Sequence, residues 1–205
     1  ALEVVSVDAR GLQGAIYVAM ANLYRKTGDH VRAVSYAELA LALREEDGDL
    51  LGVAKSHGNL GLLYRSSGEY AHAIAAYTEA MATYARIGNQ ELVAVALLNL
   101  GAASFLAGDL TEAVERYQAS LAISQTLDLA LLAIKAHYNL AEAYAAQGQR
   151  AAAREHWQIG LHLCRQHAFD DQEQDFATLG VTLGLTPPLA PTADAMPATP
   201  PDALD

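Results

Sequence analysis

The sequence is poor in the residues and runs that mark several large classes of protein. It contains a single cysteine, Cys164, so no disulfide can form within the chain, and we expect a reducing compartment, the cytoplasm. All six prolines lie between Pro187 and Pro201, so no proline interrupts a helix in the preceding residues. No run approaches the roughly 20 uninterrupted apolar residues that span a bilayer, and no basic start precedes an apolar signal core.

Basic residues are also scarce. The 13 lysines and arginines face 24 aspartates and glutamates, which gives a net charge of -11 and an isoelectric point near 4.9. Nucleic acids and anionic membranes attract positively charged surfaces. We therefore expect neither a nucleic acid nor a membrane as the main partner.

Catalytic and metal-binding motifs are missing as well. There is no Gly-x-Ser-x-Gly elbow, no phosphate-binding Gly-x-x-x-x-Gly-Lys, and no plausible pair of nucleophile and base, so we predict neither an enzyme nor a cofactor. His156, His162 and His167 share one expected helix, but no His-x-x-x-His pair or Cys-x-x-Cys exists in the sequence, and no metal site is predicted. His57 and His137 occupy equivalent places 80 residues apart, and we interpret both as residues packed beside the core.

What the sequence does contain is an internal repeat. Gly28, Gly68, Gly108 and Gly148 lie 40 residues apart, and each follows a stretch with helical periodicity. Glycine ends a helix without a side-chain clash, so each repeat should consist of two helices. The helices are expected near 10–26, 29–47, 50–66, 69–88, 90–106, 109–127, 129–147 and 149–168. The repeats are expected at 10–48, 49–88, 89–128 and 129–168. The turns between consecutive repeats offer Asp49, Asn89 and Asp128 as N-caps of the helices that follow.

The segments outside the repeats are short. We interpret residues 1–9 as the end of a preceding helix or a linker, and the helix-like start without Met suggests part of a longer protein. Residues 171–185 echo the start of a repeat and are expected to form a capping helix, because a solenoid must cover its last apolar face. The Pro- and Ala-rich residues 186–205 are expected to be disordered.

Several core positions recur together at fixed offsets. Leu60, Gly61 and Tyr64 in one first helix are matched in the other repeats, and Ala73 and Tyr77 have counterparts on the second helices. This pattern of Leu-Gly-x-x-Tyr, then Gly-Asp or Gly-Glu, then Ala, then an aromatic residue resembles the tetratricopeptide repeat. The first repeat departs from it by carrying Ala19 where the other three carry Asn.

The resemblance implies an all-α fold, a right-handed α-α superhelix of four helix-turn-helix repeats followed by the capping helix. The 40-residue period is longer than the usual 34 of the family. Long-period arrays of this kind resemble those of the Pins and kinesin light chain families and the sensor regions of bacterial regulators. The resemblance therefore implies a non-catalytic module that binds a protein or peptide.

In this family the first helices line a concave surface. Helical offsets from the core positions place on it five of the thirteen basic residues and one acid, Glu142. Such a surface suits a peptide with acidic and apolar side chains. The candidate binding residues are Asn22, Arg25, Lys26, Lys55, Asn59, Leu62, Arg65, Leu98, Asn99, Phe105, Leu106, Lys135, Tyr138 and Asn139.

Alternatives remain open at this point. Asn59, Asn99 and Asn139 can hold a peptide backbone, or they can bond the neighbouring repeat; the basic cluster can also be ordinary solvated surface. The chain can be the sensor or regulatory part of a larger bacterial regulator. It can also be a self-associating scaffold, a homodimer formed through the end repeats or by the segment 186–205 acting as a tethered ligand.

Overall fold

The computed structural model describes the backbone of residues 2–185 and the side chains of residues 10–185, and this part of the chain consists of nine α-helices without a strand. The predicted all-α fold is confirmed, while the predicted disordered segment 186–205 lies outside the described residues. The helices are α1 (Leu2–Lys26), α2 (His30–Glu46), α3 (Leu50–Ser66), α4 (Tyr70–Arg86), α5 (Gln90–Ala107), α6 (Leu110–Thr126), α7 (Ala130–Ala146), α8 (Arg150–His167) and α9 (Asp170–Thr182).

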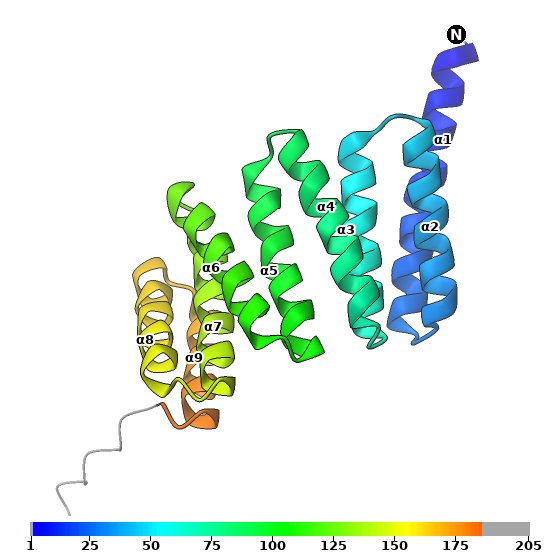
Figure 1. Cartoon of the computed structure of the whole chain (residues 1–205). Helices are drawn as coiled ribbons and strands as arrows, with labels where there is room; N and C mark the ends of the chain where they lie inside the picture. Colours follow the sequence, from blue (N-terminus) through cyan, green and yellow to red (C-terminus); the bar gives the residue numbers. More distant parts are fainter. Residues whose placement is uncertain (1, 186–205) are drawn as a thin grey trace, which may run out of the picture.

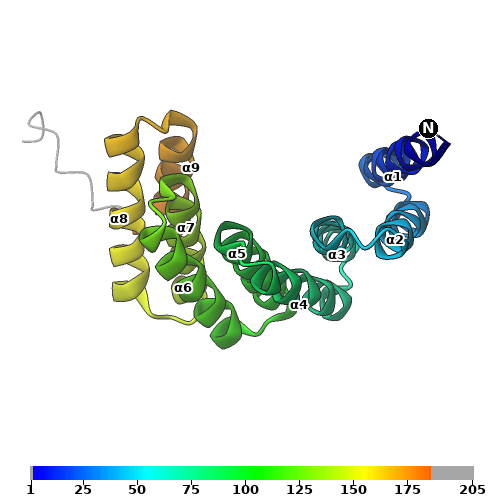
Figure 2. The ribbon, with the colours of Figure 1, turned by 90° about the horizontal axis from the view of Figure 1, so that it is seen from above.

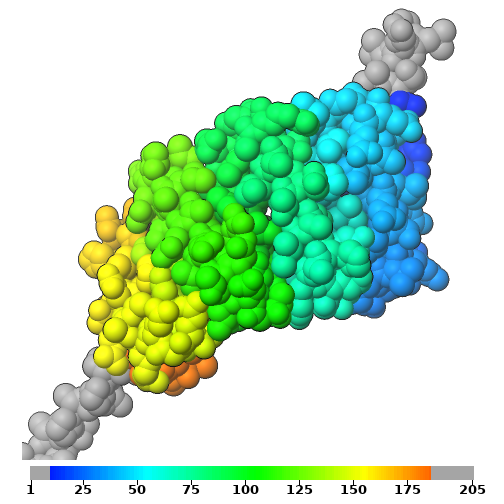
Figure 3. Space-filling view, viewed as in Figure 1, coloured from blue at the N-terminus to red at the C-terminus, as the bar shows by residue number. Residues whose placement is uncertain are grey.

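The helices stack in pairs into an arc (Figures 1 and 2). Each helix packs mainly on its neighbours in the sequence. The odd-numbered helices line the inner, concave side, and the even-numbered helices form the outer side that Figure 3 shows. The arrangement confirms the superhelix of four helix-turn-helix repeats followed by a further helix. Residues 2–9, which the sequence left as a preceding helix or linker, form the first part of α1.

The turns follow the sequence signals closely. Gly108 ends α5 in the left-handed region at φ 89°, where a residue with a Cβ would be strained. Asp49 and Asn89 accept hydrogen bonds from the first-turn N–H groups of Gly52 and Leu92, as expected of N-caps. Asp128 is different: it adopts φ 54°, and Leu129 stands at the N-cap position of α7.

Small residues allow the two helices of a repeat to approach closely. A Cβ added at Gly61 would lie 2.7 Å from the ring of Tyr77, and one added at Gly101 would lie 2.7 Å from the ring of Tyr117. Both tyrosines are almost fully buried. The recurring glycine and aromatic residue therefore form one packing unit, which explains why they recur together at a fixed offset.

Helix α9 covers the end of the fourth repeat. Trp157 of α8 donates a hydrogen bond from Nε1 to the Phe176 carbonyl over 2.7 Å, and its ring lies against Gly180. Phe176 is 1% exposed and belongs to the same core cluster as Cys164. This packing also brings one face of α9 to the concave side of the arc.

Candidate functional site

Two hollows lie on the concave side of the arc, and they share one residue. The first groove pocket has a volume of about 410 Å³ and is lined by Val18, Arg44, Lys55, Gly58, Asn59, Leu62, Tyr77, Ala80, Tyr84, Leu92, Val95, Ala96 and Asn99. The second groove pocket has a volume of about 290 Å³ and is lined by Arg65, Leu98, Asn99, Ala102, Ile134, Lys135, Tyr138, Asn139, Gln172, Asp175 and Phe176. Asn99 of α5 lies at the junction of the two pockets.

The structure brings most of the candidate binding residues to these hollows. Nine of the fourteen line one or both groove pockets: Lys55, Asn59, Leu62, Arg65, Leu98, Asn99, Lys135, Tyr138 and Asn139. Asn22 and Arg25 line a narrow crevice between α1 and α3. Lys26 and Leu106 are exposed and line none of these hollows, so the structure does not bring them to the other candidates.

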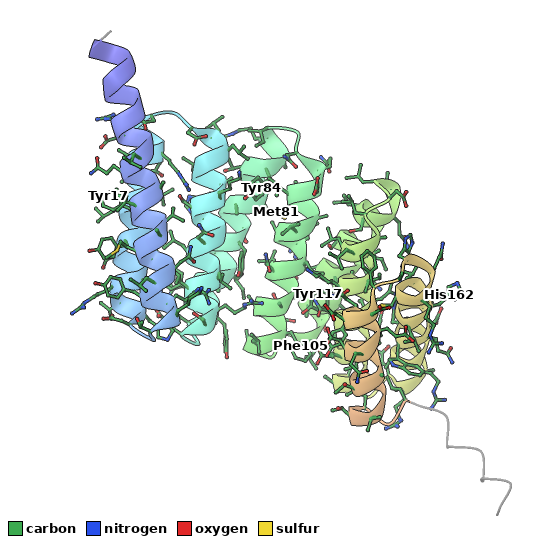
Figure 4. All side chains as sticks on the ribbon, turned by 180° about the vertical axis from the view of Figure 1, so that it is seen from behind. Tyr17, Met81, Tyr84, Phe105, Tyr117 and His162 are labelled. Atoms are coloured by element: carbon green, nitrogen blue, oxygen red, sulfur yellow. The ribbon has the colours of Figure 1, made fainter. Side chains whose placement is uncertain are left out.

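Phe105 lies apart from both groove pockets. It stands at the end of α5 (Figure 4) and lines a separate hollow of about 380 Å³ together with Glu142, Arg150 and Leu185. The apolar part of the groove is therefore not centred on Phe105. It is formed instead by Leu62 in the first pocket and Leu98 in the second.

The basic residues of the groove are not neutralised by neighbouring acids. Lys55, Arg65 and Lys135 form no salt bridge within 4.0 Å with any described residue, whereas Arg10, Arg32, Arg116 and Arg165 form salt bridges on other surfaces. Lys55 and Lys135 are exposed, and Arg65 is half-buried. An otherwise acidic protein thus carries unpaired positive charge in both groove pockets.

Residues outside the first helices also reach the groove, and the sequence did not point to them. Arg44 of α2 lines the first pocket, where its Nη1 donates to the Gly52 carbonyl over 3.0 Å and to Ser56 Oγ over 2.7 Å. From α9, Gln172 and Asp175 line the second pocket. Asp175 is the acid that lines the second pocket, whereas Glu142, the single acid expected on this surface, lines the separate hollow next to Phe105. The sequence did not predict the contribution of α9, because it depends on how α9 packs on α8.

Burial shifts the pKa of two groups at or next to the second pocket. Burial raises the pKa of the Glu142 carboxyl. Burial also raises the pKa of Tyr138, with Glu142 and Asp175 adding to the shift, so its phenol stays neutral and can donate a hydrogen bond. The second pocket therefore combines two cations, three side-chain amides, the Asp175 carboxylate and a neutral phenol.

The structure places two histidines in contact, which the sequence did not predict. His137 is 3% exposed, as expected of a core residue, but its Nδ1 lies 2.9 Å from Nδ1 of His156 on α8. His162 is exposed on the outer side of α8 (Figure 4). Within residues 10–185 there is no cluster of three or more His, Cys, Asp or Glu side chains that fits a metal ion.

One described helix, α5, is long and apolar enough to cross a membrane. It packs between α4 and α6, and its residues Val93, Leu97 and Leu100 are buried in the core. Its apolar composition is therefore accounted for by its central place in the superhelix.

A comparison with protein families matches the tetratricopeptide repeat model over residues 12–86 and 92–170. The chain belongs to the tetratricopeptide repeat family. This family consists generally of non-catalytic protein-interaction modules. No curated protein matches the chain.

Solved structures of similar shape include proteins with tetratricopeptide repeats. The apo form of RapI is 16% identical over 83% of this chain and 62% of its own, with a TM-score of 0.75. BtubC (BKLC) from P. vanneervenii is 27% identical over 78% of this chain and 66% of its own, with a TM-score of 0.69. A STAND protein with a tetratricopeptide repeat sensor from Pyrococcus horikoshii is 16% identical over 82% of this chain and 26% of its own, with a TM-score of 0.74. The chain thus spans less than two thirds of the length of RapI and about a quarter of the STAND protein.

Proposed function

We propose that the chain is a non-catalytic module that binds a peptide or protein segment across the two groove pockets. The observation that carries this proposal is the unpaired charge of Lys55 in the first pocket and of Arg65 and Lys135 in the second. Carboxylates of a bound segment would pair with these cations, and exposure of the lysines would draw such a segment in by long-range attraction.

The other groove residues would fix the position of that segment. Asn99 faces both pockets, and its amide can both donate to and accept from a peptide backbone passing from one pocket to the other. Leu62 and Leu98 offer one apolar contact in each pocket. The segment that fits best is therefore extended, with acidic side chains on both sides of an apolar one.

A displayed library of random peptides tests this proposal. Peptides selected by the wild-type chain should be enriched in Asp and Glu together with Leu or Phe. The Lys55→Glu, Arg65→Glu double variant should bind a selected peptide at least about tenfold more weakly, a loss of about 1.4 kcal/mol. Fluorescence anisotropy with a labelled peptide gives both affinities.

The matched control is the Arg86→Glu, Arg154→Glu double variant. It makes the same change of charge at two exposed arginines on the outer helices α4 and α8. This variant should bind the selected peptide as the wild-type chain does. Equal weakening by both double variants would show that only the net charge matters, and the groove would then not be the binding site.

A regulatory role is the second candidate, and the packing of the arc favours it. Each helix contacts mainly its sequence neighbours, so a ligand that bridges several first helices can change the curvature of the arc. Small-angle scattering of the chain with and without a selected peptide tests this. An unchanged radius of gyration at saturation would argue against a curvature change.

A further inference from the structure

Helix α1 presents an apolar stripe that no described residue covers. Leu12, Ile16 and Leu23 are 65%, 51% and 52% exposed, and Ala19 between them is exposed too. The spacings of four, three and four residues place all four side chains on one face of the helix. This is the spacing of the apolar positions in a coiled coil. We call these four residues the α1 seam.

The same face is covered in every other repeat. Ile16 corresponds to Ser56, Ala96 and Ala136, which are 2%, 3% and 0% exposed. Ala136 belongs to one core cluster with Tyr117 of α6, the second helix of the preceding repeat. Wherever a repeat precedes a first helix, the second helix of that repeat therefore packs against this face.

The size of the seam residues indicates which kind of helix fits. At the three internal positions equivalent to Ile16 the side chains are small, which lets the preceding helix approach closely. Ile16 is far larger than Ser56 or Ala136, so a helix packed at that close distance would overlap with it. Apolar residues in heptad spacing suit a coiled coil, in which each large side chain inserts between residues of the facing helix.

The heptad spacing also continues beyond the repeat. In the sequence, Leu2, Val5 and Ala9 extend the same four-three alternation toward the N-terminus. Helix α1 has 25 residues, against 17 in α3, and its N-terminal end extends past its neighbours (Figure 1). The apolar spacing from Leu2 to Leu23 therefore covers about 33 Å of helix, at 1.5 Å per residue. A matching seam of this length is found on another copy of the same helix.

We propose that a second copy of this chain covers the α1 seam, so that two α1 helices pair as a short coiled coil. The other faces of α1 are already occupied. Ala21 is buried on the side of α2, and Val18 and Arg25 line the crevice next to α3. Pairing through the seam leaves both groove pockets open and does not depend on their ligand.

The mass of the chain in solution tests this pairing. Sedimentation equilibrium of the wild-type chain should give twice the chain mass of 21.8 kDa at high concentration and fall toward the single mass on dilution. The Ile16→Glu, Leu23→Glu double variant should stay at the single mass. Both residues are about half exposed, so this variant should keep the helical circular dichroism of the wild type.

A control variant makes the result specific. Val31→Glu, Leu39→Glu changes two exposed apolar residues of α2, 79% and 48% exposed, and should still pair. A wild-type chain that stays at the single mass, or an Ile16→Glu, Leu23→Glu variant that still pairs, would refute the proposal.

Discussion

The imidazole pair between α7 and α8 predicts that the chain loses stability as the pH falls from 7 to 5. Nδ1 of His137 lies 2.9 Å from Nδ1 of His156, so one ring donates and the other accepts, and the two nitrogens cannot both carry a proton. The ring of Tyr144 stacks on His156, and Glu155 is the charged residue that acts on it. Protonation of both rings would place two like charges in contact.

The magnitude follows from the shift in the pKa of His137. Burial, with the neighbouring His156, lowers this pKa from 6.5 to about 4. Because the pKa is depressed in the folded state, the unfolded chain binds the proton first, and stability present above pH 6.5 is lost as the pH falls. Between pH 7 and pH 5 the loss from His137 is about 2 kcal/mol, at about 1.4 kcal/mol per pH unit. Burial also lowers the pKa of His156, which acts in the same direction.

Urea unfolding at pH 7 and pH 5 measures this effect in the wild-type chain and in a His137→Asn variant. The wild-type chain should lose about 2 kcal/mol more between the two pH values than the variant does, since other titrating groups contribute equally to both. His57→Asn, at the equivalent position of the second repeat, is the matched control and should keep the wild-type pH dependence. Parallel losses in wild type and His137→Asn would show that the pair does not control acid stability.

Two further predictions concern packing. Gly101→Ala should destabilise the chain by about 1–3 kcal/mol in urea unfolding, because the added Cβ would lie 2.7 Å from the Tyr117 ring. Gly58→Ala, with no atom within 4 Å of an added Cβ, should instead raise stability by up to about 1 kcal/mol; equal effects would contradict the packing argument. Trp157→Phe should lower the free energy of unfolding by about 1 kcal/mol, since the Phe176 carbonyl loses the indole N–H as a donor and keeps only its bond within α9. An unchanged midpoint would show that this bond contributes nothing.

The sequence predicted the helices well because each boundary carries its own local signal. The helix expected at 50–66 is α3 (Leu50–Ser66), bounded by the Asp49 cap at its start. The glycine at each turn and the glycine-aromatic pairs act over a few residues or within one repeat. Asp128 shows the limit of such signals: a good capping residue was present, but the turn placed it one residue too early, in the left-handed region.

The residues that line the two groove pockets were predicted only in part, for a geometric reason. Helical periodicity gives the face on which a residue lies, and it correctly placed Lys55 and Lys135 on the concave side. It does not give the rotation of one helix against the next. The contact of His137 with His156, 19 residues apart, and the position of Asp175 beside the second pocket both depend on that rotation. Contributions from second helices and from α9 therefore needed the structure.

The α1 seam offers a physical reason why residue 19 departs from the pattern of the other three repeats. Asn59, Asn99 and Asn139 occupy one position of the first helices, and Ala19 is the exception. In α1 that position belongs to the exposed seam, where a polar side chain would lower the stability of helix pairing. Replacing Ala19 by Asn should therefore weaken pairing of the chain while leaving the helix folded. Asn is the residue that the other three repeats carry at this position. A pairing constant unchanged by Ala19→Asn would place the contact between copies elsewhere on the molecule.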